Sequence, residues 1–195
     1  MNEIHQKIEL FLNRYNLNNP DFTYLVAFSG GFDSMCLLDS LRKITPNHIV
    51  ALHLNHGWRG EESNLEEVNC RKFCMSIGVS FYGERLPETV AKTETAAREA
   101  RYDFFKRCAE KFNSDIVFTA HNKNDNAETL IYRICKGTGI SGLQGISPHR
   151  DIYYRPLLEV SRDEIENYCK VQNLTPNSDS SKCNTKYKRN FIRAK

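Results

Sequence analysis

Long apolar runs, signal-peptide features, internal repeats and low-complexity segments are all missing from this sequence of 195 residues. No run approaches the roughly 20 apolar residues that a membrane-spanning helix needs, so we expect no membrane partner. No Gly-x-x-x-x-Gly-Lys-Ser/Thr loop occurs, which excludes nucleotide binding of the Walker A type. A net charge of +3 does not by itself indicate a nucleic-acid partner. With 40% hydrophobic and 26% charged residues, the chain suits one α/β domain with a substantial core.

The cysteines do not form the pattern of a disulfide framework or a zinc site. There are seven, an odd number, and they are scattered along the chain. Several fall on predicted helix faces beside apolar residues, which favours reduced, buried thiols in a cytoplasmic protein. Cys70 and Cys74 lie one helical turn apart, but no second pair completes a zinc site.

Strand-like and helical segments alternate along the chain. Period and capping signals predict strands near 24–28, 48–54, 79–86, 115–120 and 152–154, and helices near 3–17, 34–43, 62–77, 94–112, 125–136 and 161–173. This alternation predicts an α/β fold with a parallel, Rossmann-like sheet and helices on both faces. Ligands bind such sheets at the carboxyl ends of the strands, where residues 29–34, 54–60 and 121–128 are therefore expected to lie.

The most informative segment is Phe28-Ser29-Gly30-Gly31-Phe32-Asp33-Ser34, which follows the first predicted strand. Glycine lets the backbone approach a phosphate closely, and the N–H groups that open the next helix face an anion. Ser29 and Ser34 can add hydroxyl donors, and Asp33 can hold a magnesium ion. The simpler interpretation is a tight strand-to-helix turn in which Asp33 or Ser34 caps the helix.

Two pairs of charged side chains share helix faces. Arg98 and Arg101 are three residues apart, so both can clamp a phosphate; a solvated pair, or an ion pair of Arg98 with Glu94, is the alternative. Asp125 and Glu128 are also three apart, near a helix start. They either bind magnesium and accept a proton, or simply cap the helix.

Histidines and a basic end complete the candidate residues. His121 ends a strand, a position that favours a role in the site, and His53 and His56 bracket a turn. Six basic and no acidic residues occupy positions 182–195, which suits a phosphate backbone or a solvated tail. Residues 137–142 match Gly-x-Gly-x-x-Gly, but they follow a predicted helix and are interpreted as a loop.

The glycine segment resembles the Ser-Gly-Gly-x-Asp-Ser loop of the PP-loop ATPases. Together with five further segments in the same order, it makes the chain resemble the tRNA(Ile)-lysidine synthetase family from about residue 24 to residue 193. The five segments are 53–59 (HLNHGWR), 94–102 (ETAAREARY), 119–129 (TAHNKNDNAET), 155–158 (RPLL) and 189–193 (RNFIR). The resemblance implies a sheet of the adenine nucleotide α-hydrolase type, with ATP and Mg²⁺ as cofactors.

The resemblance also implies a ligation in two steps. ATP adenylates the C2 oxygen of the wobble cytidine in tRNA(Ile) with a CAU anticodon, and free L-lysine then displaces AMP to give lysidine. It implies ATP binding by Ser29, Gly30, Gly31, Phe32, Asp33, Ser34 and Arg98; catalysis by Asp33, His121, Asp125 and Glu128, with Mg²⁺ on Asp33 and Asp125; and tRNA contacts by His56, Arg59, Arg101, Arg189 and Arg193. His121, Asp125 and Glu128 are equal candidates for the base, and a homodimer is left open.

The sequence departs from the family in one segment. Where many members have two adjacent acids, this chain has Asn124 before Asp125, which leaves Asp125 and Glu128 as the acidic pair. The chain also ends soon after residues 189–193. Residues 1–195 are therefore interpreted as the catalytic PP-loop domain, without the family's downstream tRNA-binding domains.

Other functions stay open at this stage. A PP-loop tRNA thiolase of the iron–sulfur type needs a Cys-x-x-Cys pair, which is absent. An amidating synthetase with an N-terminal glutaminase would need a further domain, and only a short segment precedes the first predicted strand. A non-catalytic ATP- and RNA-binding module would release no pyrophosphate; Asp33, Asp125 and Glu128 argue against it. Reduction of an adenosine-phosphosulfate-like substrate would depend on Cys183, whose lysine-rich setting lowers a thiol pKa.

Overall fold

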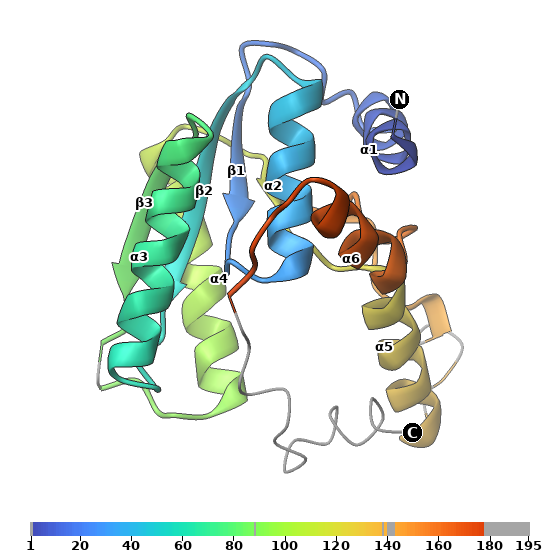
Figure 1. The fold of residues 1–195 in the computed structure, drawn as a ribbon. Coiled ribbons are helices and arrows are strands. Elements are labelled where there is room, and N and C mark those ends of the chain that lie inside the picture. Colours follow the sequence, from blue (N-terminus) through green and yellow to red (C-terminus); the bar gives the residue numbers. More distant parts are fainter. Residues whose placement is uncertain (1, 88, 138, 140–142, 178–195) are drawn as a thin grey trace.

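The computed structural model describes residues 2–87, 89–137, 139 and 143–177 (Figure 1). Within them the elements are α1 (Glu3–Arg14), β1 (Thr23–Ala27), α2 (Phe32–Ile44), β2 (His48–Asn55), α3 (Glu61–Ser76), β3 (Ser80–Arg85), α4 (Glu94–Lys111), β4 (Val117–Phe118), α5 (Lys123–Cys135), β5 (His149–Arg150), β6 (Tyr153–Tyr154) and α6 (Arg162–Val171). The strands form one sheet in the order β3-β2-β1-β4-β6-β5. All described pairings are parallel except β5 with β6, so the predicted parallel α/β sheet is confirmed.

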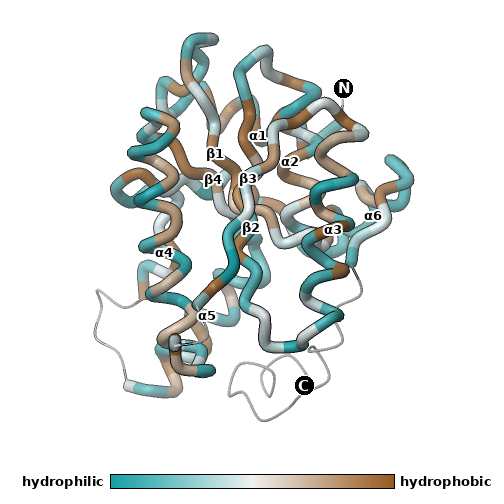
Figure 2. The backbone as a smooth tube through the Cα atoms, turned by 90° about the vertical axis from the view of Figure 1, so that its left-hand side faces the viewer, coloured by the Kyte–Doolittle hydropathy of each residue, from teal (hydrophilic) through white to brown (hydrophobic). Residues whose placement is uncertain are grey.

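Helices cover both faces of this sheet, as predicted. Successive side chains of a strand point to opposite faces, so Tyr24 and Val26 pack with α1, α2, α3 and α6 while Leu25 packs against α4. Phe104 and Phe105 of α4 fill the second core. Figure 2 shows the arrangement with the apolar strands in the middle, α4 on the left, and α2, α3 and α6 on the right.

A buried carboxylate joins the three helices α1, α2 and α6. The Asp39 side chain is 2% exposed and accepts hydrogen bonds from Lys43 Nζ at 2.6 Å and Tyr168 OH at 2.7 Å. Arg42 pairs with its second oxygen, and His5 lies 3.0 Å from the Tyr168 hydroxyl. Burial alone raises the pKa of a carboxyl, but these donors together lower the pKa of Asp39. The network therefore holds α6 against α2, the helix that follows the glycine segment.

Some predicted boundaries were wrong. The helix expected from residue 34 begins at Phe32 with Gly31 as its N-cap, and the helix expected from residue 125 begins at Lys123. The strand expected over 115–120 is shorter, and it pairs with both β1 and β6 only at Val117–Phe118. The β5–β6 hairpin was missed; its turn holds Asp151 at a φ of +54°, a conformation that apolar periodicity does not reveal.

The cysteine prediction is confirmed for the described residues. Cys36, Cys70, Cys74, Cys108 and Cys169 are free and buried, and Cys135 is free and exposed. Burial raises the pKa of Cys70, Cys74, Cys108 and Cys169 to about 12, so these thiols stay protonated. Cys183 lies outside the described residues. No helix in the described part of the chain has the length and apolar character to cross a membrane.

Candidate active site

Three loops meet at the carboxyl ends of the parallel strands, which is the lower edge of the sheet in Figure 1. β1, β2 and β4 end there at Ala27, Asn55 and Phe118. The loop after β4 contacts the start of α2, because Asn122 Nδ2 donates to Asp33 Oδ1 at 2.9 Å. The loop after β1 contacts β2, since His53 Nδ1 donates to the Phe28 carbonyl at 2.9 Å. The predicted meeting of these segments is confirmed.

The glycine segment gives the start of α2 a backbone geometry that suits an anion. Gly30 adopts a φ of +78°, which other residues rarely tolerate, and Gly31 is the N-cap of α2. The N-cap makes no side-chain hydrogen bond to the helix, so it satisfies none of the first-turn N–H groups. A Cβ at Gly31 would meet only Ser29 Oγ, at 3.5 Å. This geometry fits the negatively charged oxygens of a polyphosphate.

The two serines of the segment brace each other. Ser34 Oγ accepts the Ser29 N–H at 3.3 Å and donates to the Gly31 carbonyl at 3.1 Å, while the two hydroxyl oxygens lie 3.2 Å apart. Ser34 is 5% exposed, so its hydroxyl shapes the turn from inside. The interpretation of Asp33 or Ser34 as the N-cap was wrong, because Gly31 holds that position and both residues lie within the first turn.

Asn122 connects the two helix starts and was missed by the sequence reasoning. It is 2% exposed, and its side-chain oxygen accepts the Asp125 N–H at 3.0 Å while its amide nitrogen donates to Asp33. The Asp125 carboxylate in turn accepts the Asn122 N–H at 3.1 Å, which completes a capping box. The spacing of Asn122 and Asp125 is the signal that a search for this box would have found.

The acidic residues of α5 occupy different positions around this box. Asp125 takes part in capping, as the simpler sequence interpretation proposed, although as the third helical residue and not as the N-cap. Glu128 lies one turn further along α5, and His121 Nδ1 lies 3.0 Å from the hydroxyl of Thr119. Asn124 accepts the Arg162 N–H at 3.0 Å with its amide oxygen. This residue therefore ties α5 to the start of α6.

The loop after β2 presents His56 and Trp58. His53 belongs to β2 and is 7% exposed, so the prediction that it brackets a turn was wrong. Arg101 Nη2 lies 3.4 Å from His56 Nε2; an arginine only donates, so this nitrogen accepts and the imidazole is neutral. Burial, and then the Arg101 charge, lower the pKa of His56 to about 4. The rings of His56 and Trp58 are 5.5 Å apart.

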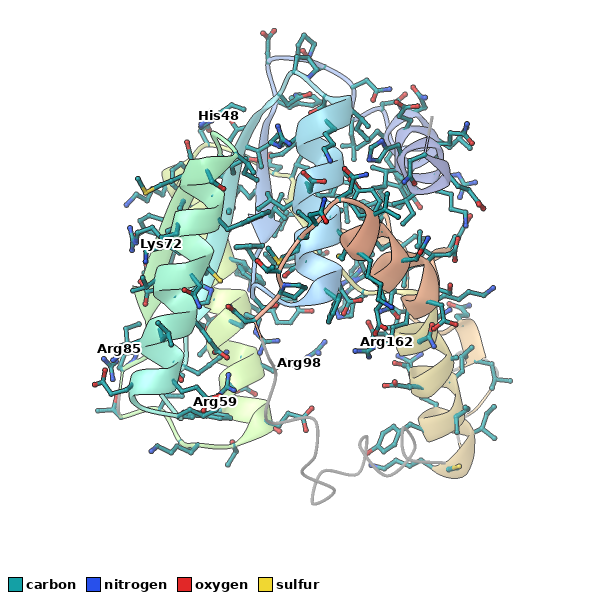
Figure 3. All side chains as sticks on the ribbon, in the orientation of Figure 1. His48, Arg59, Lys72, Arg85, Arg98 and Arg162 are labelled. Carbon is teal, nitrogen blue, oxygen red and sulfur yellow. The ribbon has the colours of Figure 1, made fainter. Side chains whose placement is uncertain are left out.

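The predicted arginines have different partners. Arg59 pairs with Glu62 at 3.0 Å and Glu66 at 2.6 Å, which anchors the loop to α3. Arg98 lies over the Tyr102 ring at 5.1 Å, and the described residues show no ion pair of Arg98 with Glu94. Figure 3 shows Arg59 and Arg98 on the side of the molecule where α3 and α4 begin.

Comparison with known proteins identifies the family. A family model described as the PP-loop domain matches residues 1–195. The chain belongs to the PP-loop domain family. Its glycine segment, placed between β1 and α2 at the carboxyl edge of the sheet, is therefore the PP-loop, and the nucleotide that the family binds is ATP.

Curated relatives of this PP-loop chain share one name. The protein "tRNA(Ile)-lysidine synthase" of Clostridium tetani is 40% identical over 199 residues, which cover 95% of this chain and 43% of that protein. The protein of the same name from Thermotoga maritima is 42% identical over 177 residues, covering 87% of this chain and 43% of that protein. The resemblance found in the sequence is confirmed. The chain spans less than half the length of these relatives.

Solved structures with little sequence identity share the fold. The U34-tRNA thiolase NcsA from Methanococcus maripaludis matches 98% of this chain and 68% of its own, with a TM-score of 0.76 and 18% identity. The NH3-dependent NAD synthetase from Campylobacter jejuni matches 88% and 73%, with a TM-score of 0.60 and 17% identity. These similarities support the Rossmann-like sheet around the PP-loop.

The remaining predicted features of the site are its C-terminal arginines and its magnesium ion. Arg189 and Arg193 lie outside the described residues, as do most of residues 137–142. No three His, Cys, Asp or Glu side chains in the described ranges lie close enough to hold a metal ion alone. Mg²⁺ often binds one or two carboxylates together with substrate phosphates, and the carboxylates of Asp33 and Asp125 both accept hydrogen bonds from Asn122.

Proposed function

We propose that this PP-loop chain is the catalytic domain of a tRNA(Ile)-lysidine synthetase, acting in the cytoplasm. It joins lysine to C2 of the wobble cytidine of tRNA(Ile) with a CAU anticodon. The observation that carries the proposal is the junction of PP-loop and α5 through Asn122 and Asp33. That junction lies in a chain 40% identical to a tRNA(Ile)-lysidine synthase along 95% of its length.

In the first step the C2 oxygen of the cytidine attacks the α-phosphorus of ATP. A phosphorus–oxygen bond forms to the cytidine, the bond between the α- and β-phosphates breaks, and pyrophosphate leaves. The first-turn N–H groups of α2 and the backbone of Gly30 and Gly31 hold the departing phosphates. A bound Mg²⁺ neutralises phosphate charge, and Asp33 with Asp125 would hold it.

In the second step the ε-amine of lysine attacks C2, and AMP departs with the original C2 oxygen. The amine has a reference pKa near 10.4, so it must lose a proton before or during attack. His121, Asp125 and Glu128 are the proposed acceptors. Asp125 already accepts the Asn122 N–H with one oxygen, whereas Glu128 lies beyond the capping box. Asp125 therefore also places the start of α5, and the proton passes to one of these three side chains.

The substrate RNA is proposed to bind next to the PP-loop. Arg101 and neutral His56 lie beside each other on α4 and the β2 loop, and both are proposed to contact the anticodon loop. Arg98 is proposed to contact a phosphate of ATP, and Arg189 and Arg193 the RNA backbone. Arg59 acts through its ion pairs with α3, which fix the loop that carries His56.

Pyrophosphate release tests the adenylation step. The chain is incubated with ATP, Mg²⁺ and unmodified tRNA(Ile) carrying C34, and a U34 version of the same tRNA is the control. We expect release that depends on C34, with AMP appearing only after lysine is added. Release that is equal without RNA, or no release at all, would contradict the proposal that these residues form the catalytic domain.

A further inference from the structure

The segment that follows α6 returns to the PP-loop. In Figure 1 it crosses in front of α2 towards α3. There the Asn177 N–H donates to the Gly30 carbonyl at 2.9 Å. The residues between α6 and Asn177 belong to none of the sequence motifs, and the proposed function assigns this contact no role.

The side chain of Asn177 is also engaged. Its amide nitrogen lies 3.5 Å from the Glu66 carbonyl and 3.5 Å from the Cys70 sulfur, and its oxygen accepts from Asn69 Nδ2 at 3.4 Å. All three partners belong to α3. Asn177 therefore joins the PP-loop, α3 and the chain after α6 at one point.

This junction is closely packed around Gly30. A Cβ added to Gly30 would contact the Asn177 amide nitrogen and lie 2.6 Å from the Cys70 sulfur. At a φ of +78°, Gly30 has the conformational freedom to turn its carbonyl in several directions, so its orientation needs an external partner. The Asn177 N–H is that partner in this structure.

The orientation of this carbonyl determines where a phosphate-binding group points. The Gly30 carbonyl and the Gly31 N–H belong to the same planar trans peptide and therefore point in opposite directions. With the carbonyl held by Asn177, the Gly31 N–H points towards the Ser29 hydroxyl and donates to Ser29 Oγ at 3.4 Å. Rotation of this peptide would turn the N–H away from the anion and the carbonyl dipole towards it.

We propose that Asn177 is a positioning residue of the ATP site. Its backbone N–H holds the Gly30–Gly31 peptide in the orientation that binds phosphate. Its side chain contacts α3 and thereby keeps this N–H in position. The inference rests on the proposed function only in taking ATP as the ligand. It assigns to the segment after α6 a direct effect on nucleotide affinity.

Two variants separate the backbone contact from the side-chain contacts. Asn177→Pro removes the N–H that Gly30 uses, whereas Asn177→Ala keeps it and removes the contacts with α3. Thr175→Pro is the matched control, because it puts proline into the same segment at a residue with no backbone hydrogen bond in the described structure. The dissociation constant for ATP is measured by titration calorimetry, KM for ATP and kcat by pyrophosphate release, and the folded fraction by thermal unfolding.

Loss of one hydrogen bond weakens binding about tenfold, so we expect Asn177→Pro to raise the ATP dissociation constant and KM by about that factor. Asn177→Ala should raise both by about threefold, and Thr175→Pro should leave them unchanged. A merely structural role would lower the unfolding temperature without changing the ATP affinity of the folded fraction, and this result would overturn the inference.

Two further outcomes are decisive. If Asn177→Pro does not fold, unchanged ATP affinity in Asn177→Ala overturns the inference. A wild-type chain that binds no ATP overturns it as well. Failure of the proposed function is read separately: a chain that binds ATP, responds to Asn177 substitution and forms no lysidine supports the positioning role and contradicts the synthetase assignment.

Discussion

Asn122 is the residue whose replacement should separate helix capping from the chemistry of the site. Its side chain accepts the Asp125 N–H and donates to Asp33 from a position that is 2% exposed. Asn122→Ala removes an N-cap, which costs about 1 kcal/mol, and a hydrogen bond to a charged group, which costs about 1.5–3 kcal/mol. The sum is about 2.5–4 kcal/mol, or a fall of roughly 5–16 °C in unfolding temperature for a chain of this size.

Asn122→Ser is the informative partner of that variant. Serine is a good N-cap, but its short side chain does not reach Asp33, so only the contribution of the Asp33 hydrogen bond should be lost. Stability should therefore lie between wild type and Asn122→Ala, whereas pyrophosphate release should fall as far as in Asn122→Ala. Thermal unfolding by circular dichroism and single-turnover pyrophosphate release measure the two effects. Full pyrophosphate release by Asn122→Ser would refute the reasoning that Asn122 orients Asp33.

Three further predictions follow. Asp33→Asn keeps an oxygen for Asn122 and should preserve the circular dichroism spectrum but reduce pyrophosphate release at least about a hundredfold; wild-type activity would contradict its role. The pKa of His56 is about 4 in the folded chain and about 6.5 in the unfolded chain, so the free energy of unfolding should fall as the pH drops from 6.5 to 4. In denaturant titrations, His56→Gln should lessen this fall by on the order of 1–2 kcal/mol, and an identical fall in the variant would contradict the neutral imidazole. Trp58 is the sole tryptophan, so RNA binding beside His56 should change its emission and Trp58→Phe should abolish the signal; unchanged emission at RNA saturation would contradict the proposed surface.

The order of the elements could be predicted because apolar periodicity and turn residues are local. Strand β1, for example, is a short apolar run with a double glycine shortly after it, and α6 follows the serine of a capping box that is present in the structure. Parallel topology then follows from the alternation of strands and helices, and it places the loops at one edge. These steps need no knowledge of distant contacts.

The parts that sequence reasoning missed depend on partners far apart in the chain. Asn122 contacts Asp33 across 89 positions, and Asn177 contacts α3 across more than 100 positions, so no local pattern predicts either of these two contacts. Arg59 illustrates the reverse case. Its tRNA contact stays a prediction, whereas its guanidinium pairs with acids three and seven residues away, a spacing that can be seen in the local sequence.

Nucleoside mass spectrometry tests the central claim most directly. Unmodified tRNA(Ile) with a CAU anticodon is incubated with the chain, ATP, Mg²⁺ and lysine labelled with ¹⁵N at the ε-amine, then digested to nucleosides. The account predicts one lysine–cytidine adduct that requires both ATP and lysine and retains the label on the nitrogen bound to C2. Pyrophosphate release without this adduct, or an adduct joined through the α-amine, would contradict it.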